Sequence, residues 1–514
     1  MLAATQNPVA EALALGQSLE QKNKPNEAIQ VYQNLLGRVP NNEEAIIRIT
    51  QIFLRHKEYA NAVKSLNYYL KITKNKELAH YNLGIAYQKL RKNEEAINAF
   101  IAAIKANAGY PLSYAPLYSL LERFGRLSEM RELIAKVHKK HEKVGEIAWM
   151  QAKLLVAEKA FVEAADIFAK AEKLGICKEM KSIFFSDYAH LLAKCGRYDD
   201  AMEVHKKAQK LLSLTPDAKA VDETFSENVI KFSYQGFAEE EVKQWQTTAV
   251  SDKNDPIFVI GFPRSGTTLM EQILSAHPNL IVTDELQVLR KRVANLNQLL
   301  GRTINYPKGL NTLSKKELNT IREAYFKGMS EELPEYDKHL RIVDKVPMSI
   351  KFLGFIKRLF PESPILMMIR DPRDVCLSCF FQHFASNEST VNFFSLKQTF
   401  EYYAKTMELY LFFKERLGAN IMEVKYETMC EDFEPYARRI MEHVGENWQD
   451  SLLDFYKPQH SRFIATPSFD AVSQPVNKKA VGNWQNYTKH IEPLEPIIAP
   501  YLDKFGYARI SELK

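Results

Sequence analysis

Cysteine and long hydrophobic runs are both scarce in this sequence. The cysteines of the 514-residue chain are scattered, at Cys177, Cys195, Cys376, Cys379 and Cys430. Five are too few for a disulfide framework, and they favour a reducing compartment. The densest apolar runs, such as residues 365–369, are far shorter than the ~20 residues that a membrane-spanning helix needs. We therefore expect no association with a membrane.

A strong charge imbalance and a leader segment are also lacking. Lysine and arginine total 69 against 63 aspartates and glutamates, a formal net charge of +6. This small excess permits an anionic ligand but does not indicate nucleic acid, and basic stretches such as residues 138–141 are typical of solvated helix faces. The start, MLAATQNPVAEALALG, lacks the basic region and compact apolar core of a secretory signal. The sequence thus predicts a cytoplasmic protein without a nucleic-acid partner.

In other respects the composition is that of an ordinary globular protein. Hydrophobic residues make up 46% and charged residues 26%, and the length suggests several domains. Changes of pattern along the chain predict a helical array over residues 1–214, a connector over 215–254 and a second domain over 255–514. The connector is polar and acidic, and a β-type run follows it.

A repeat fills the first of these segments. One position recurs at four intervals of 34 residues and a final interval of 37, at Ala28, Ala62, Ala96, Met130, Ala164 and Ala201. Mostly small residues lie twelve positions earlier, such as Gly16 and Gly84, and mostly large ones four positions later, such as Tyr32 and Phe100. Small residues let two helices approach, and large residues fill the space between them. This pattern resembles the tetratricopeptide repeat, a helix-turn-helix unit that builds an α-solenoid.

Such arrays usually present a concave peptide-binding face. We therefore expect the repeats to recruit a peptide or protein. They could equally serve as a spacer or as a dimerisation element, in which case a homodimer would form.

A strand, a glycine loop and a helix open the second domain. Residues 257–260 are apolar and mostly β-branched, which predicts a buried strand. The loop GFPRSGTT follows at 261–268, and a helix is expected from Leu269. This order is typical of a phosphate cradle at a helix N-terminus. Thr267 stands where nucleotide-hydrolysing loops carry lysine, and Arg264 supplies the positive charge instead, which disfavours ATP or GTP hydrolysis.

A second strand-loop-helix pattern occupies residues 365–378. Arg370 comes at the carboxyl end of a short buried strand, where open α/β sheets bind ligands. Ser378 follows about two helical turns later, so the two side chains could hold one phosphate. The alternative is a surface ion pair between Arg370 and Asp371, which would contribute little. Cys376 and Cys379 lack a second cysteine pair nearby, so we expect them to pack in the core rather than bind zinc.

The two motifs PRSGTTL and IRDPRDVCLS together resemble the sulfotransferase superfamily. The stretch PRSGTTLMEQILSAHPNLIVTDELQVL is most similar to the tyrosylprotein sulfotransferases and to their bacterial repeat-bearing relatives. The resemblance covers residues 257–507. It implies an α/β, P-loop-like fold with a central parallel sheet, and 3′-phosphoadenosine 5′-phosphosulfate (PAPS) as the sulfuryl donor. No metal ion is required, because fixed cations replace it.

The resemblance also implies roles for individual residues. The loop residues Arg264, Ser265, Gly266, Thr267 and Thr268 would bind the 5′-phosphosulfate, and Arg370 with Ser378 the 3′-phosphate. Glu285 falls on the catalytic glutamate, Lys345 on the transition-state lysine, Tyr426 near the nucleotide and Ser468 on a serine that stabilises the transferring group. Asn483 and Gln382 depart from the family, since each replaces a basic residue. Lys478 and Lys479 could compensate for them.

Elementary chemistry supports these roles. The acceptor hydroxyl must lose a proton, and Glu285 can act as its general base. Arg264 and Lys345 can neutralise the charge that builds on the transferring group. The alternatives are an exposed carboxylate for Glu285, at a helix start beside Asp284, and a simple ion pair with Asp344 for Lys345.

The sequence therefore predicts a sulfotransferase that acts on a hydroxyl, with protein or peptide tyrosine as the first candidate acceptor. A carbohydrate or small-molecule acceptor remains open, because the donor site does not specify the acceptor. An inert catalytic half beside a functional repeat scaffold is the alternative from another class.

Overall fold

The computed structural model describes residues 7–138, 141–237, 239–243, 245, 250–252, 254–333, 335–457 and 475–513. The chain forms two compact units, Met1–Val204 and His205–Lys514. No helix within the described ranges is long and apolar enough to cross a membrane. Each unit is considered by itself below.

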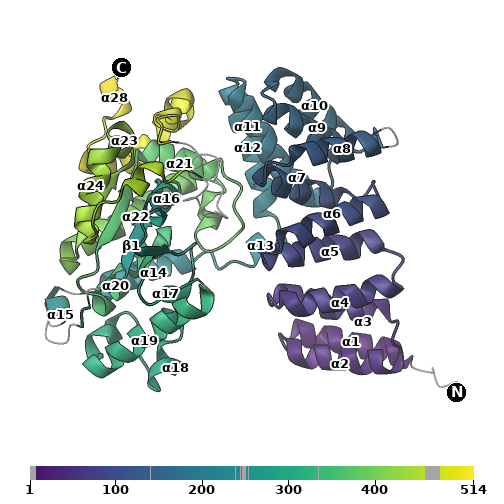
Figure 1. Cartoon of the computed structure of the whole chain (residues 1–514), viewed down its shortest axis with the longest axis horizontal. Coiled ribbons are helices and arrows are strands. Elements are labelled where there is room, and N and C mark those ends of the chain that lie inside the picture. Colours follow the sequence, from purple (N-terminus) through teal and green to yellow (C-terminus); the bar gives the residue numbers. More distant parts are fainter. Residues whose placement is uncertain are drawn as a thin grey trace. The chain divides into compact units, whose positions relative to one another are not determined.

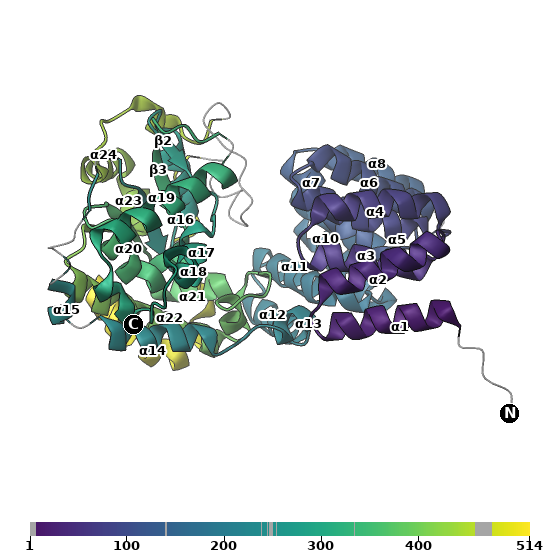
Figure 2. The same cartoon turned by 90° about the horizontal axis from the view of Figure 1, so that it is seen from below.

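The first unit consists of paired helices (Figure 1). They are α1 (Pro8–Gln21), α2 (Pro25–Arg38), α3 (Glu43–Arg55), α4 (Tyr59–Ile72), α5 (Lys76–Lys89), α6 (Asn93–Ala106), α7 (Tyr114–Arg123), α8 (Leu127–His138), α9 (Gly145–Ala157), α10 (Phe161–Leu174) and α11 (Lys181–Lys194), with short 3-10 turns at Pro111–Ser113 and Lys178–Met180. A further helix, α12 (Tyr198–Ser213), begins in this unit. Figure 2 shows the same pairs from below.

The turn inside each pair repeats one backbone conformation. A residue with positive φ follows the first helix of every pair, at Asn23 (56°), Lys57 (62°), Arg91 (59°), Gly125 (68°), Lys159 (64°) and Gly196 (75°). These positions keep the 34-residue spacing of the sequence up to Lys159. The periodicity therefore reflects a repeated turn as well as a repeated core.

Glycine at the recurring small position lets the two helices of a pair touch. A Cβ at Gly16 would lie 2.3 Å from Tyr32 Cε1, and one at Gly84 would lie 2.5 Å from Phe100 Cε1. Tyr32 and Phe100 are fully buried. The expected combination of a small residue facing a large one is thus confirmed in these repeats, and with it the solenoid part of the predicted fold.

The second unit is built on a five-stranded sheet. Its strands are β1 (Ile257–Gly261), β2 (Leu280–Val282), β3 (Arg341–Lys345), β4 (Ile365–Ile369) and β5 (Ile421–Lys425). All neighbouring pairs are parallel, in the order β2-β3-β1-β4-β5. Apolar residues fill β1 and β4, which are buried along their whole length, as expected for strands covered on both faces.

Helices connect and cover these strands. They are α13 (Pro216–Lys219), α14 (Phe225–Gly236), α15 (Glu239–Lys243), α16 (Thr267–Ser275), α17 (Val288–Ala294), α18 (Leu296–Leu300), α19 (Lys315–Glu332), α20 (Leu353–Leu359), α21 (Pro372–Phe380), α22 (Leu396–Leu417), α23 (Tyr426–Glu431), α24 (Phe433–Val444), α26 (Thr488–Ile491), α27 (Glu495–Phe505) and α28 (Ile510–Leu513). The 3-10 segments are Lys308–Thr312, Pro347–Phe352, Thr390–Phe393, Asp450–Asp454, Asn483–Tyr487 and Glu492–Leu494. The first three helices lie within the segment predicted as a connector.

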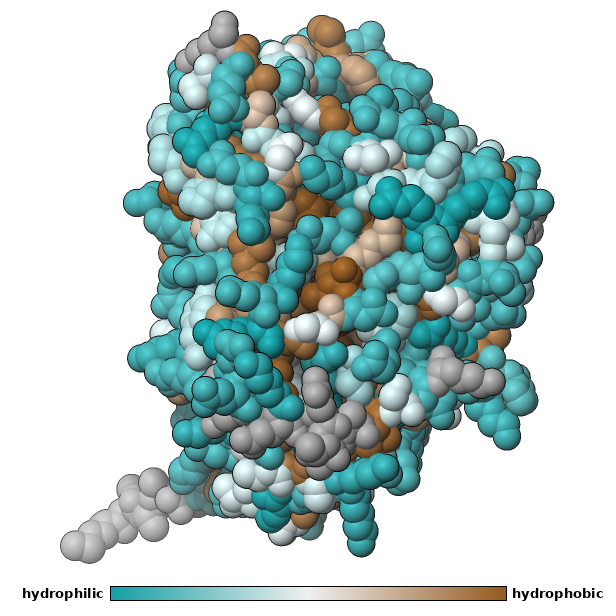
Figure 3. All heavy atoms as spheres, turned by 90° about the vertical axis from the view of Figure 1, so that its left-hand side faces the viewer, coloured by the Kyte–Doolittle hydropathy of each residue, from teal (hydrophilic) through white to brown (hydrophobic). Residues whose placement is uncertain are grey.

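Two apolar layers hold the sheet. On one face, residues of α16 and α24, such as Met270 and Ile440, pack against Val259 and Val343 in one buried cluster. A second set of aromatic contacts joins Phe258 of β1 to Phe360, 5.8 Å between ring centroids, and Phe360 to Tyr325 of α19. The predicted central parallel sheet is therefore confirmed. On the face seen in Figure 3, hydrophobic residues lie in scattered groups among hydrophilic ones, as is common on protein surfaces.

Candidate active site

The loop after β1 forms a backbone cradle at the start of α16. Gly266 precedes the helix with a φ of 106°, and a Cβ at this position would lie 2.6 Å from Tyr426 Cδ2. Arg264 also has a positive φ, of 69°. The hydroxyl of Ser265 is buried and has no hydrogen-bond partner among the described residues. The helix begins at Thr267, two residues earlier than the sequence predicts, which adds the backbone N–H groups of its first turn to the cradle.

Three of the predicted phosphate-binding residues lie in one hydrogen-bonded group. Arg264 Nε donates to Ser378 Oγ at 3.0 Å, and Arg370 Nη1 donates to the carbonyl oxygen of Arg264 at 3.0 Å. The group joins the ends of β1 and β4, two adjacent parallel strands, to α21. Burial lowers the pKa of the Arg264 guanidinium. An anion placed beside it would offset that cost.

Arg370 is held in place by several partners. Its guanidinium lies 5.0 Å from the centre of the Tyr426 ring, 3.6 Å from Asp374, and donates to the carbonyl oxygen of Ala480. Its Nε is buried, and no residue in the described part of the chain accepts a hydrogen bond from it. Asp371 does not pair with Arg370 as the alternative interpretation has it, because Asp371 accepts from Arg373 at 2.7 Å. Arg370 therefore keeps one donor for a further group.

A lysine between two carboxylates occupies the end of β3. Lys345 Nζ lies 2.8 Å from Glu285 Oε1 and 2.8 Å from Glu271 Oε2, and the Lys345 side chain is wholly buried. Burial lowers the pKa of Lys345, but Glu271 and Glu285 outweigh this effect and raise it. Burial raises the pKa of Glu271 to about 7, although Lys345 opposes the shift. Two of the predicted catalytic residues, Glu285 and Lys345, are thus in direct contact.

Asp344 is not the partner of Lys345. Neighbouring residues of a strand point to opposite faces, and Asp344 Oδ2 instead accepts from the hydroxyl of Tyr325 at 2.8 Å. Glu285 precedes α17 and has a positive φ of 52°, with 41% of its side chain exposed. A carboxylate that combines this exposure with a buried ammonium partner is not a simple helix-start residue.

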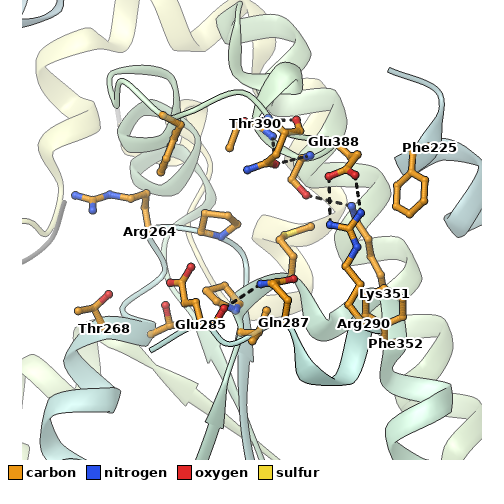
Figure 4. A pocket seen from close by; sticks show the side chains of 18 residues that line it. Phe225, Arg264, Thr268, Glu285, Gln287, Arg290, Lys351, Phe352, Glu388 and Thr390 are labelled. Atoms are coloured by element: carbon orange, nitrogen blue, oxygen red, sulfur yellow. Dashed lines mark hydrogen bonds and ion pairs between the residues drawn. The ribbon is translucent and has the colours of Figure 1, made fainter. Parts of the chain in front are cut away.

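A cavity of about 380 Å³ adjoins these residues (Figure 4). Arg264, Thr267, Thr268 and Glu285 line it together with Phe225, Pro263, Gln287, Arg290, Val346, Pro347, Met348, Lys351, Phe352, Phe384, Asn387, Glu388, Ser389 and Thr390. Figure 4 places Thr268 and Glu285 at one end and the ion pair of Arg290 with Glu388 at the other. The closer contact of that pair, between Nη2 and Oε1, is 2.5 Å.

The remaining predicted residues lie outside this group. Lys478 is exposed, and its ammonium donates to Glu431 at 3.0 Å. Lys479 is also exposed, and its carbonyl oxygen accepts from Asn483 Nδ2 at 3.2 Å. Gln382 is partly buried just after α21. Ser468 falls outside the described residues.

Sequence reasoning missed Glu271 and Lys351. Lys351 is buried, and its ammonium donates to the hydroxyls of Ser226 at 2.8 Å and Ser389 at 3.2 Å. Glu271 is the one carboxylate in the mostly apolar run Leu269-Met270-Glu271-Gln272-Ile273-Leu274, where its charge is a signal in itself. Nothing in the sequence indicates its partner, because Lys345 comes much later in the chain.

Comparisons with known proteins place similarities in both units of the chain. The sulfotransferase family model matches residues 256–450, and tetratricopeptide-repeat models match residues 13–76 and 78–110. The sulfotransferase domain of the Synechococcus PCC 7002 olefin synthase is 18% identical and covers 51% of this chain and 97% of its own, with a TM-score of 0.37. That score is too low to establish a shared fold by itself.

Relatives of known sequence are more informative. An uncharacterized protein of Aquifex aeolicus is 27% identical over 317 residues, 60% of this chain and 40% of that protein. Protein-tyrosine sulfotransferase A of Caenorhabditis elegans is 28% identical over 275 residues, 49% of this chain and 67% of that protein. This chain thus spans less than half the length of the Aquifex aeolicus relative. Residues 256–450 are thus similar to the sulfotransferase family, and segments similar to tetratricopeptide repeats precede them in this chain.

Proposed function

We propose that the second unit transfers a sulfuryl group from PAPS to an acceptor hydroxyl, with tyrosine of a peptide or protein as the acceptor. The observation that carries the proposal is that the anion-binding loop after β1 and the Glu285–Lys345 pair line or adjoin a single cavity. A donor in the loop and an acceptor in the cavity would meet beside Glu285.

The residues present fit the donor. Ser265 Oγ, within the loop, and Arg370 Nε, beside it, are buried donors to which the described ranges supply no acceptor. Gly266 leaves the backbone open where a side chain would meet Tyr426. Arg264 to Thr268 would hold the 5′-phosphosulfate, and Arg370 with Ser378 the 3′-phosphate, next to the Tyr426 ring. When bound, PAPS supplies an activated sulfuryl group on a phosphate leaving group.

The chain's own residues supply the remaining chemistry. Glu285 takes the proton of the acceptor hydroxyl, because its carboxylate lies 2.8 Å from the Lys345 ammonium and lines the cavity. The half-buried Arg264 and the fully buried Lys345 are cations that lie where negative charge would build up. Their fixed positions avoid reorganisation during the reaction.

The cavity supports an aromatic acceptor. Phe225, Phe352 and Phe384 line it, and the curated relatives of Caenorhabditis elegans and Gallus gallus are protein-tyrosine sulfotransferases. A phenol ring can pack against these side chains with its hydroxyl toward Glu285. The tetratricopeptide repeats would add affinity for the protein that carries the tyrosine.

The first experiment offers ³⁵S-labelled PAPS with tyrosine peptides, glycans or small phenols to the full chain. We expect label on tyrosine. Glu285→Gln should lower transfer by about 100-fold or more while 3′-phosphoadenosine 5′-phosphate binding stays within about twofold. Arg264→Ala should lose both sulfuryl transfer and nucleotide binding.

Glu434→Gln is the matched control, because Glu434 makes an exposed ion pair with Arg438 on α24. It should behave as wild type. Label on glycans alone would show that the acceptor is a carbohydrate and not tyrosine. No transfer to any acceptor by a chain that binds the nucleotide would contradict the catalytic proposal and favour an inert scaffold.

A further inference from the structure

Glu271, the second carboxylate that contacts Lys345, has no role in the proposed sulfuryl transfer. Glu271 lies on α16, which starts at the anion-binding loop, and its carboxylate is 2.8 Å from Lys345 Nζ. Lys345 is fixed from its backbone as well, since its N–H donates to Thr283 Oγ1 at 3.0 Å. The Lys345 ammonium thus lies between two carboxylates, that of Glu271 on α16 and that of Glu285, which precedes α17.

The two carboxylates differ in their surroundings. The Glu271 side chain is 8% exposed, whereas that of Glu285 is 41% exposed and lines the cavity. Solvent screens the charge of Glu285 and hardly reaches that of Glu271. Asp284 is the other charged group whose field reaches Glu271. The buried contact therefore interacts more strongly with the ammonium.

Above about pH 7, where Glu271 is ionised, proton transfer to Glu285 removes one of the two negative charges beside Lys345. The proton leaves the acceptor hydroxyl and ends on the Glu285 carboxylate, and Lys345 neither gains nor loses a proton. Lys345 is then a buried cation, and its partner Glu285 has become neutral. A buried ammonium without a counter-charge has a strongly lowered pKa and tends to lose its proton.

We infer that Glu271 is a positioning residue that holds the Lys345 ammonium charged and in place while Glu285 changes its protonation state. This inference rests on the proposed function, because it assigns Glu285 as the base. Glu271 itself touches neither substrate: it lies behind Lys345 and does not line the cavity.

The inference is tested on the ammonium directly, without reference to turnover. The full chain is labelled with [ε-¹³C]lysine, and the Lys345 resonance is assigned by its loss in Lys345→Arg. We expect Glu271→Gln to lower the pKa of Lys345 by at least one unit and Glu285→Gln to lower it less. Glu271→Asp should restore part of the loss.

Kinetics provide the second readout. Glu271→Gln should lower kcat by about 10-fold or more, leave the KM for PAPS within about threefold, and move the alkaline limb of the kcat profile to lower pH. Glu446→Gln is the matched control: Glu446 is 3.5 Å from Arg341, at the opposite end of β3, and is similarly shielded. It should leave the Lys345 titration and kcat unchanged.

The possible failures are distinct. An unchanged Lys345 pKa in Glu271→Gln, or a larger fall in Glu285→Gln, would overturn the inference even if the wild type transfers sulfate. A wild type without transfer whose Lys345 titration follows the expected order would instead contradict the proposed function. Glu271→Asp keeps the charge, so it separates a charge effect from a folding defect in Glu271→Gln.

Discussion

Asp344 shows how burial alone sets the behaviour of a carboxylate in this protein. Its side chain is buried beside the Tyr325 hydroxyl, and burial raises its pKa to about 7 from an ordinary value of 3.8. The folded chain therefore holds the protonated form more tightly than the unfolded chain does. The resulting stability is present below about pH 4 and is lost as the pH rises through about 7.

Asp344→Asn should remove this pH dependence, because asparagine can accept the Tyr325 hydrogen bond without ionising. Relative to wild type, the variant should gain on the order of 2 kcal/mol in unfolding free energy between pH 5 and pH 8. Urea unfolding of the full chain at both pH values measures the difference. Parallel pH curves for the two proteins would show that Asp344 does not titrate in this range.

Single residues of the site were predictable to different extents. Arg264, Arg370 and Ser378 could be predicted because each follows the end of a recognisable strand or lies on the helix after it. The contact of Lys345 with Glu271 could not, since it depends on how α16 packs against β3. The sequence analysis left the Lys345–Asp344 pair open, and the structure excludes it because adjacent residues of β3 point to opposite faces.

The turns of the repeats carry strain at regular positions. Lys57 and Lys159 have φ values of 62° and 64°, a conformation that costs a residue with a Cβ about 1–2 kcal/mol. Gly125 and Gly196 occupy the same position in other repeats. Three of the six turns, at Lys57, Arg91 and Lys159, thus use a residue that is poorly suited to the conformation, whereas asparagine at Asn23 tolerates it.

Lys57→Gly and Lys159→Gly should each stabilise the full chain by about 0.5–1 kcal/mol, because relief of the strain exceeds the entropy that glycine adds to the unfolded chain. Urea unfolding followed by far-ultraviolet circular dichroism measures this. Lys64→Gly, at an exposed position inside α4, should instead destabilise by about 1 kcal/mol. Destabilisation by all three variants would refute the assignment of strain to the turns.

Elements were predicted best where their signals are local. The 34-residue repeat depends on contacts within one helix pair, such as Gly84 with Phe100, so the sequence alone reveals it. The start of α16 was placed two residues late, because the N–H groups of a first helical turn need no apolar side chain to mark them. Helices such as α19 and α22 left no signal that the sequence analysis used.

The whole chain combines a repeat unit with a sheet whose strand order was beyond sequence reasoning. The change from helical periodicity to alternating strands and helices predicts the two fold types, and both are confirmed. The order β2-β3-β1-β4-β5 depends on contacts between strands far apart in the chain. That order is what brings the ends of β1, β3 and β4 together, and with them the loop, Lys345 and Arg370.

The shared wall of the cavity has a consequence for the kinetic order of the reaction. Arg264, Thr267 and Thr268 belong to the loop after β1 and also line the cavity beside Glu285, so under the proposed function donor and acceptor would occupy adjoining space at one time. The residues known to line the cavity include no cysteine or histidine to carry the group between substrates. Initial-velocity plots at varied concentrations of both substrates should therefore intersect, whereas parallel lines would reveal a covalent carrier.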